Sequence, residues 1–70
     1  MLIKLTRFTR NGEEFDVMVN PAEILMAYRS ASDTTTVEFR RDKGTGATYI
    51  RVKESPDRIK EIIDDSRERL

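Results

Sequence analysis

The dipeptide Asn11-Gly12 constrains this chain more than any other feature, because it stands between two runs of alternating apolar and polar residues. Asn-Gly favours a two-residue β-hairpin turn, in which both central positions need a positive φ angle. The flanking runs, residues 2–9 and 14–20, are therefore predicted to form two paired antiparallel strands.

A loop of two residues also fixes which side chains face each other across the predicted hairpin. Phe8 then meets Phe15 and Arg7 meets Asp16, which are an aromatic pair and a pair of opposite charges. Such cross-strand pairs contribute roughly 0.2–1 kcal/mol each, so they support this register. The register leaves apolar side chains on both faces of the hairpin, and each face then needs cover.

One face of that hairpin, together with the strand that follows it, is the candidate surface for a protein partner. The apolar side chains assigned to it are Ile3, Leu5, Met18 and Leu25. The alternative is that these side chains belong to the core of the domain, which is the commoner fate of large apolar residues.

The segment after the hairpin combines a helix-start signal with a strand pattern. Asn20 is a typical N-cap, and Pro21 suits the first position of a helix. We expect a single helical turn over Pro21–Glu23 and then a strand over residues 24–30, because the next loop arrives too soon for a longer helix.

A second hairpin is predicted from the β-branched run over residues 34–41 and the following run over residues 47–53. If residues 43–46 form a four-residue loop, Phe39 faces Ile50 and the apolar pairs share one face of the sheet. The other face then carries charged and aromatic side chains.

The clearest helix signal is Ser55-Pro56-Asp57, which combines an N-cap residue, a proline at the first helical position and an acid in the first turn. It predicts a helix over residues 56–69. One stripe recurs at helical spacing: Ile59, Ile62, Ile63, Ser66 and Leu70. Because a helix of this length is marginal in water by itself, we expect the stripe to dock on the sheet.

These elements predict a single small domain over residues 1–70, since 70 residues are too few for a second core. Its fold class is α+β, with about five mostly antiparallel strands over residues 2–53 in a small rolled or barrel-like sheet and one C-terminal helix over residues 56–69. The core is thin, so pairing as a homodimer or docking on a partner would add stability.

Composition argues against several kinds of chemistry. The chain has no cysteine and no histidine, so it lacks disulfides, thiolate zinc sites, the commonest general base and the commonest metal ligand. Its acidic pairs, Glu13-Glu14 and Asp64-Asp65, consist of adjacent residues, which point apart in a strand or a helix. We therefore expect no catalytic residue, no metal site and no cofactor, and hence no enzyme.

The hydropathy pattern bears on location. No apolar run reaches the roughly eighteen residues of a transmembrane helix. The apolar N-terminus is interrupted by Lys4 and Arg7, unlike the core of a signal peptide. We expect a cytoplasmic protein that does not insert into a membrane.

A basic set around the second hairpin makes a nucleic-acid-binding or regulatory protein the alternative. The candidate patch is Arg40, Arg41, Lys43 and Tyr49, with Arg7, Arg10 and Arg51 as further members. Basic side chains beside an aromatic ring are typical of single-strand binding. However, the thirteen basic and thirteen acidic residues cancel, so a solvated strand face is favoured and nucleic acid is the less expected partner.

Short segments in a characteristic order run along almost the whole chain: Met1-Leu2-Ile3-Lys4-Leu5-Thr6-Arg7, Asn11-Gly12-Glu13-Glu14-Phe15, Val19-Asn20-Pro21 with Ile24, Asp33-Thr34-Thr35, and Tyr49-Ile50-Arg51-Val52-Lys53-Glu54-Ser55. In these segments the chain resembles the small flagellar FlbD and swarming-motility SwrD family. The resemblance implies a non-enzymatic cytoplasmic accessory protein that acts through protein contacts in flagellar motor function or swarming. It implies no catalytic residues.

Overall fold

The computed structural model describes residues 1–30, 33–40 and 48–68 of the chain. Within these ranges the elements follow in the order β1 (Ile3–Phe8), β2 (Glu14–Val19), the 3-10 turn η1 (Pro21–Glu23), β3 (Ile24–Arg29), β4 (Thr35–Phe39), β5 (Thr48–Val52) and α1 (Pro56–Glu68). The predicted α+β class is confirmed, with five strands and one C-terminal helix.

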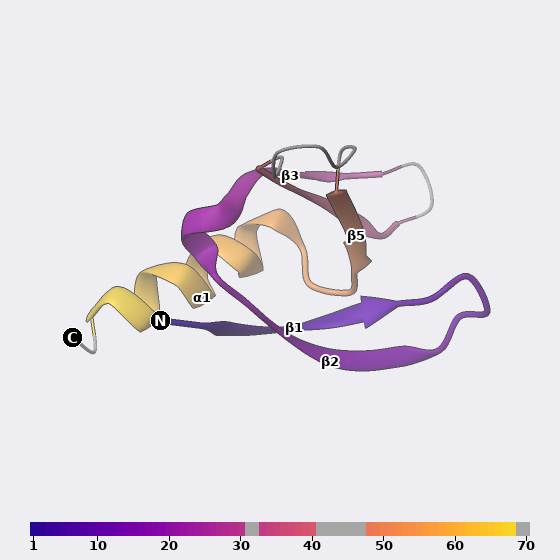
Figure 1. Ribbon diagram of the computed structural model, residues 1–70, viewed down its shortest axis with the longest axis horizontal. Helices are drawn as coiled ribbons and strands as arrows, with labels where there is room; N and C mark the ends of the chain where they lie inside the picture. The colour runs from indigo at the N-terminus through magenta and orange to yellow at the C-terminus, as the bar shows by residue number, and fades with distance from the viewer. Residues whose placement is uncertain (31–32, 41–47, 69–70) are drawn as a thin grey trace.

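The strands form one antiparallel sheet in the order β2-β1-β5-β4-β3. β1 thus pairs with β5, which comes much later in the chain. Figure 1 shows β1 and β2 in a lower layer, with β3 and β5 above them. The sheet is not closed, because β2 and β3 are its two edges, so the predicted barrel-like shape describes it only loosely.

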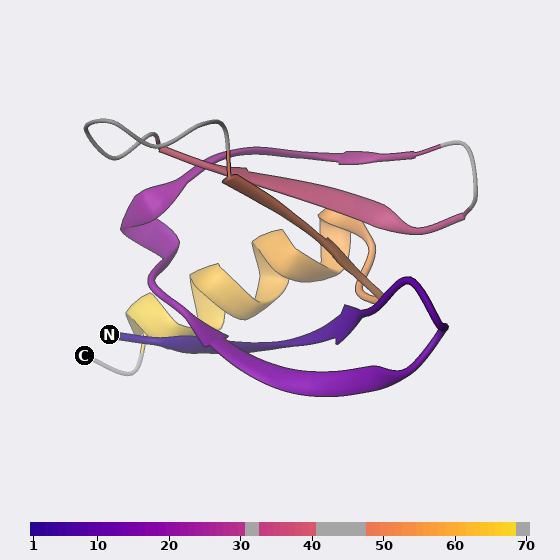
Figure 2. The same cartoon turned by 45° about the vertical axis from the view of Figure 1, so that its right-hand side comes forward.

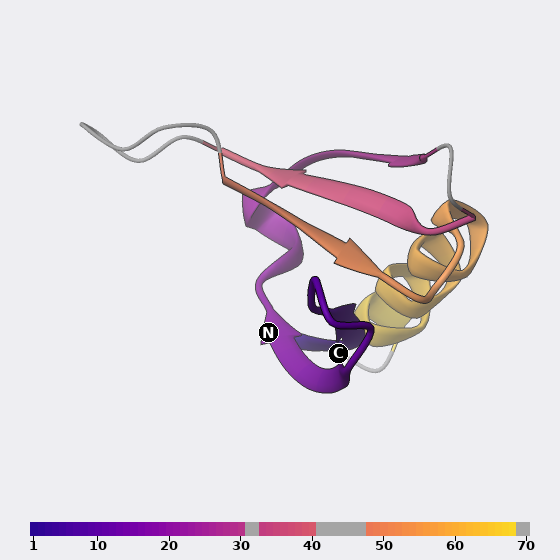
Figure 3. The same cartoon turned by 90° about the vertical axis from the view of Figure 1, so that its right-hand side faces the viewer.

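The helix α1 lies between the β1–β2 hairpin and the β3–β4 hairpin, as Figure 2 shows, and it contacts β1 and β3. In Figure 3, η1 lies at the left of the view and α1 at the right. Ile59 of α1 is buried, and Ile62 and Ile63 pack against the same cluster. The other buried apolar residues come from the strands: Ile3, Leu5, Val37 and Val52. The isoleucine stripe therefore docks on the sheet as predicted.

The first hairpin has a three-residue loop instead of the predicted two-residue turn. The N–H of Gly12 donates to the carbonyl of Thr9 at 3.0 Å, and the N–H of Thr9 donates to the carbonyl of Glu13 at 2.9 Å. Gly12 has a φ of 79°, whereas Asn11 is not among the described residues with a positive φ. One left-handed residue suits a three-residue loop with a G1 bulge, and a type I′ turn would need two.

The longer loop moves the register of this hairpin by one residue. Phe8 faces Glu14 and Arg7 faces Phe15, so the predicted aromatic pair and the predicted pair of Arg7 with Asp16 are both wrong. Because side chains alternate along a strand, a shift of one residue moves each side chain of β2 to the other face relative to β1.

The second hairpin pairs two residues away from its predicted register. Phe39 faces Thr48 instead of Ile50, and Ile50 faces Val37. A shift of two residues keeps every side chain on its predicted face, so the apolar pattern fits both registers equally well. The length of the loop decides between them, and the predicted loop, residues 43–46, lies outside the described residues.

Two predicted caps are confirmed. The Oδ1 of Asn20 accepts the N–H of Ala22 at 3.0 Å, at the start of η1. The Oγ of Ser55 accepts the N–H of Arg58 at 3.1 Å, and the carbonyl of Ser55 accepts the N–H of Ile59 at 2.9 Å. Each cap satisfies an N–H group that has no partner within its own helix.

Ser55→Ala is expected to lower the free energy of unfolding by about 0.5–2 kcal/mol, because the first turn of α1 loses the side-chain acceptor for one of its N–H groups. Urea unfolding followed by circular dichroism measures the change. Ser55→Thr keeps a hydroxyl at the cap and is expected to unfold close to the wild type. An alanine variant as stable as the threonine variant would contradict the role of the cap.

Candidate functional site

Of the four side chains predicted for a protein-binding surface, two lie in the core and two are exposed. Ile3 and Leu5 are only 3% and 0% exposed, so their assignment to a surface is wrong. The one-residue change of register explains the error, because it places Val19 and Val17 of β2 opposite Ile3 and Leu5 and so makes this face of the hairpin the core face. Met18 and Leu25 are 57% and 61% exposed.

Leu25 belongs to an apolar stretch on the edge strand β3. Ile24 faces Phe39 and Met26 faces Glu38, which leaves Leu25 as the extra residue of a β-bulge. The exposed large side chains on this strand are Leu25, Met26 and Tyr28. We call these three residues the β3 edge. β3 is the last strand of the sheet, so one side of its backbone has no neighbouring strand among the described residues.

The hydroxyl of Tyr28 on β3 interacts with Glu38 of the neighbouring strand β4. A side-chain hydrogen bond with Glu38, followed by desolvation and the charge of Glu38, raises the pKa of Tyr28 above its ordinary value.

Met18 lies at a different feature, a shallow groove between the β1–β2 hairpin and α1. Leu2 and Ile62 line the groove beside Met18, and Arg58 and Asp65 contribute charged groups from α1. The groove is therefore lined by both apolar and charged side chains.

Of the predicted basic patch, the structure describes Arg40 and Tyr49, and Arg40 lies against η1. The N–H of Arg40 donates to the carbonyl of Glu23 at 2.8 Å, and its Nε donates to the carbonyl of Ala22 at 3.3 Å. These two bonds hold Arg40 against η1. Arg41 and Lys43 lie outside the described residues.

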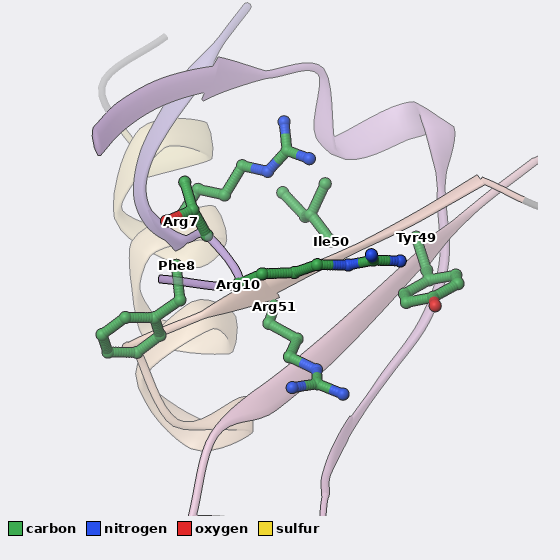
Figure 4. A pocket seen from close by; sticks show the side chains of 7 residues that line it. Arg7, Phe8, Arg10, Tyr49, Ile50 and Arg51 are labelled. Atoms are coloured by element: carbon green, nitrogen blue, oxygen red, sulfur yellow. The ribbon is translucent and has the colours of Figure 1, made fainter. Parts of the chain in front are cut away.

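A different set of basic side chains comes together at the place where β1 and β5 part. A pocket of about 300 Å³ lies there, and Figure 4 shows it from close by. The residues that line it are Arg7, Phe8, Thr9, Arg10, Tyr49, Ile50 and Arg51. Tyr49 is a member of the predicted basic patch, and the three arginines are its further members. We call this pocket the arginine pocket.

The pocket forms because the ladder between β1 and β5 is short. The ladder ends at the pair Phe8–Arg51. In the same register Arg10 would face Tyr49, but these two residues are not paired. Figure 4 shows the side chain of Arg10 directed toward the ring of Tyr49. The parted strands thus leave a gap between two backbones, and long side chains from both strands surround it.

The charges around the pocket are unbalanced. Within the described residues, the ion pairs involve side chains other than the three arginines. Glu14, which faces Phe8, lies 3.6 Å from the Nζ of Lys53. Glu38, which faces Tyr49, interacts with Tyr28. The described lining therefore holds three positive charges and no carboxylate.

Among the residues that the structure describes, no group of three or more acidic side chains is placed to hold a metal ion. None of the helices in the described ranges has the length and apolar character of a membrane span. Comparison with protein-family models, with curated proteins and with solved structures found no match for this chain.

Proposed function

We propose that this chain is a non-enzymatic adaptor module that acts in the cytoplasm by binding another protein. The proposal follows the flagellar and swarming accessory family that the sequence resembles, in which protein contacts are the activity. The observation that carries it is the β3 edge, because an edge strand with exposed apolar side chains offers both hydrogen-bonding backbone and apolar area to a partner.

The partner that suits this surface is an extended segment of a different protein. Such a segment adds to the sheet as a further strand through backbone hydrogen bonds. The side chains of Leu25, Met26 and Tyr28 then supply the contacts that select it. The bulge at Leu25 twists the edge locally and restricts which strands can pair there.

Deleting the gene in its host is expected to reduce swarming, and the wild-type gene is expected to restore it. A gene carrying Leu25→Lys is expected to fail, because a charge in the middle of the β3 edge opposes burial against a partner. Phe15→Lys is the matched control, since Phe15 is an exposed apolar residue on the other edge strand, β2. Melting temperatures of both purified variants confirm that they fold.

Normal swarming after deletion would overturn the accessory role. Equal failure of the two lysine variants would overturn the assignment to the β3 edge. A photo-crosslinking amino acid at position 25 is expected to capture a second protein of different mass. A crosslinked product of twice the mass of the chain would instead indicate a homodimer and contradict a separate partner.

A further inference from the structure

We propose that the arginine pocket binds a nucleoside phosphate, either as a free nucleotide or as one unit of a single-stranded nucleic acid. This function goes beyond protein binding, and the residues that carry it differ from those of the β3 edge. Three features support it: the charge of the pocket, its exposed ring and its size.

The charge of the pocket calls for an anion. Arg7, Arg10 and Arg51 come from two strands and a loop, and the described lining contains no acid to neutralise them. Arg51 faces Phe8, whereas Arg7 faces Val52, so Arg7 and Arg51 lie on opposite faces of the sheet. Arg10 and Arg51 therefore supply the positive potential on the face of Tyr49, which attracts an anionic ligand. A planar guanidinium group donates paired hydrogen bonds to a carboxylate or to a phosphate, and a phosphate has a further oxygen that accepts from a second arginine.

The ring of Tyr49 supplies the second feature. Tyr49 is 59% exposed, although its aromatic surface would be stabilised by cover. An exposed aromatic ring next to arginines is a platform on which a nucleobase stacks. Figure 4 shows Arg10 directed toward this ring from the opposite side of the gap, so a base on Tyr49 would have its phosphate beside Arg10.

The size of the pocket limits the ligand. Its volume of about 300 Å³ lies at the small end of the range for ligand sites, ~300–1,000 Å³. A single nucleotide suits this volume better than a long strand does. The zero net charge of the chain agrees, because a protein that follows a nucleic-acid backbone over many phosphates carries an excess of basic residues.

The test is a titration of the ¹⁵N-labelled full chain, followed by amide chemical shifts at low salt. Four probes separate the parts of the ligand: adenosine 5′-monophosphate, adenosine, inorganic phosphate and a single-stranded hexa-adenylate. Saturable shifts that include the amides of Arg10, Tyr49 and Arg51 are expected with the nucleotide and the hexamer. Binding of the nucleotide is expected to be at least about tenfold tighter than binding of phosphate or adenosine, since each of them makes only part of the contacts.

Variants assign the binding to the pocket. Arg51→Gln and Arg10→Gln are each expected to weaken nucleotide binding about tenfold or more, because each removes a charge-assisted contact. Tyr49→Ala is expected to weaken it about five- to a hundredfold, and Tyr49→Phe, which keeps the ring face, is expected to bind like the wild type. Arg58→Gln is the matched control on α1, where Arg58 already pairs with Glu61 at 3.5 Å.

Salt dependence distinguishes one bound unit from a long track. With one or two phosphate contacts, affinity for the hexamer is expected to fall only about three- to sevenfold between 50 and 200 mM salt. Separate binding curves for the nucleotide and the hexamer show which source is preferred.

Several results would overturn the proposal. These are no saturable shifts with the nucleotide and the hexamer at low salt, phosphate binding as tight as nucleotide binding, or tighter binding of a phosphorylated peptide than of the nucleotide. An effect of Arg58→Gln as large as that of Arg51→Gln would also overturn it. Unchanged melting temperatures across the variants keep a loss of binding separate from a loss of fold.

Discussion

Leu5→Ala is expected to leave the protein largely unfolded at physiological temperature. Leu5 of β1 is 0% exposed and belongs to the core cluster, in which Val37, Val52 and Ile59 are also buried. Truncation of a buried leucine costs about 2–5 kcal/mol, because apolar contacts are lost and a cavity remains. Domains of this size rarely have more than about 3–5 kcal/mol of stability from their core, so this one change removes most of it.

Urea and thermal unfolding followed by circular dichroism measure this effect. Met18→Ala is the matched control, because Met18 is 57% exposed and its truncation is expected to change stability by no more than about 0.5 kcal/mol. If Leu5→Ala and Met18→Ala had the same melting temperature, the placement of Leu5 in the core would be wrong. If the expected result holds, a loss of partner binding in a Leu5 variant reports unfolding and says nothing about the interface.

Glu54→Ala is expected to lower the free energy of unfolding by about 2–3 kcal/mol. The carboxylate of Glu54 accepts the N–H of Thr6 at 2.9 and 3.1 Å, and its Oε2 accepts the hydroxyl of Thr6 at 2.9 Å. The N–H of Lys53 donates to the carbonyl of Thr6 at 2.9 Å. The carboxylate of Glu54, which follows β5, therefore serves as the hydrogen-bond acceptor for the backbone N–H of Thr6 in β1. Removing this carboxylate leaves that partly buried N–H group without an acceptor.

Two further variants test the origin of that effect. Thr6→Val removes the hydroxyl and keeps the N–H, so it is expected to cost only about 1 kcal/mol. Glu61→Ala is the matched control, because the carboxylate of Glu61 makes an exposed ion pair with Arg58 at 3.5 Å, worth about 0.5 kcal/mol or less. If Glu54→Ala and Glu61→Ala unfolded at the same urea concentration, the hydrogen bonds to Thr6 would contribute nothing to the free energy of unfolding.

The bonds between Thr6 and Glu54 connect two of the segments on which the proposed family resemblance rests. Thr6 lies in the opening segment of that resemblance and Glu54 lies in its last segment, 48 residues apart. Residues that meet across such a separation serve the fold whatever the protein binds. The resemblance in these two segments therefore bears on architecture first, and the flagellar role depends on the experiments at the β3 edge.

Features encoded by neighbouring residues were predictable from the sequence. The cap at Ser55, the turn at Asn20, the isoleucine stripe and the existence of each strand all follow from patterns a few residues long. Each involves residues that interact within one element or across one turn, so the local pattern contains the necessary information.

The registers were not predictable in the same way. Asn11-Gly12 fits a loop of two residues or a loop of three, and the φ angle of Asn11 separates them. The wrong choice placed Met18 instead of Val17 opposite Leu5, so the core face of β1 was assigned to a surface. At the second hairpin the pairing of Phe39 was wrong by two residues, because the apolar alternation is unchanged by such a shift.

The arginine pocket was beyond the reach of local patterns for a further reason. Arg51 and Arg10 are close only because β5 adds to β1, and pairing between sequence-distant strands leaves no periodic signal. The sequence pointed to Tyr49 and to the arginines individually, and it centred them on Arg40, which the structure places at η1.

The pairing of β1 with β5 has a consequence for how the protein is made. During translation β1 leaves the ribosome first, yet the strand that covers it is the last of the five to be synthesised. Until then the nascent chain carries an apolar hairpin without its neighbours, a state that favours aggregation and proteolysis. Nascent chains that lack β5 are therefore expected to be degraded, and cooperative folding of the domain is expected only after β5 and α1 have been synthesised.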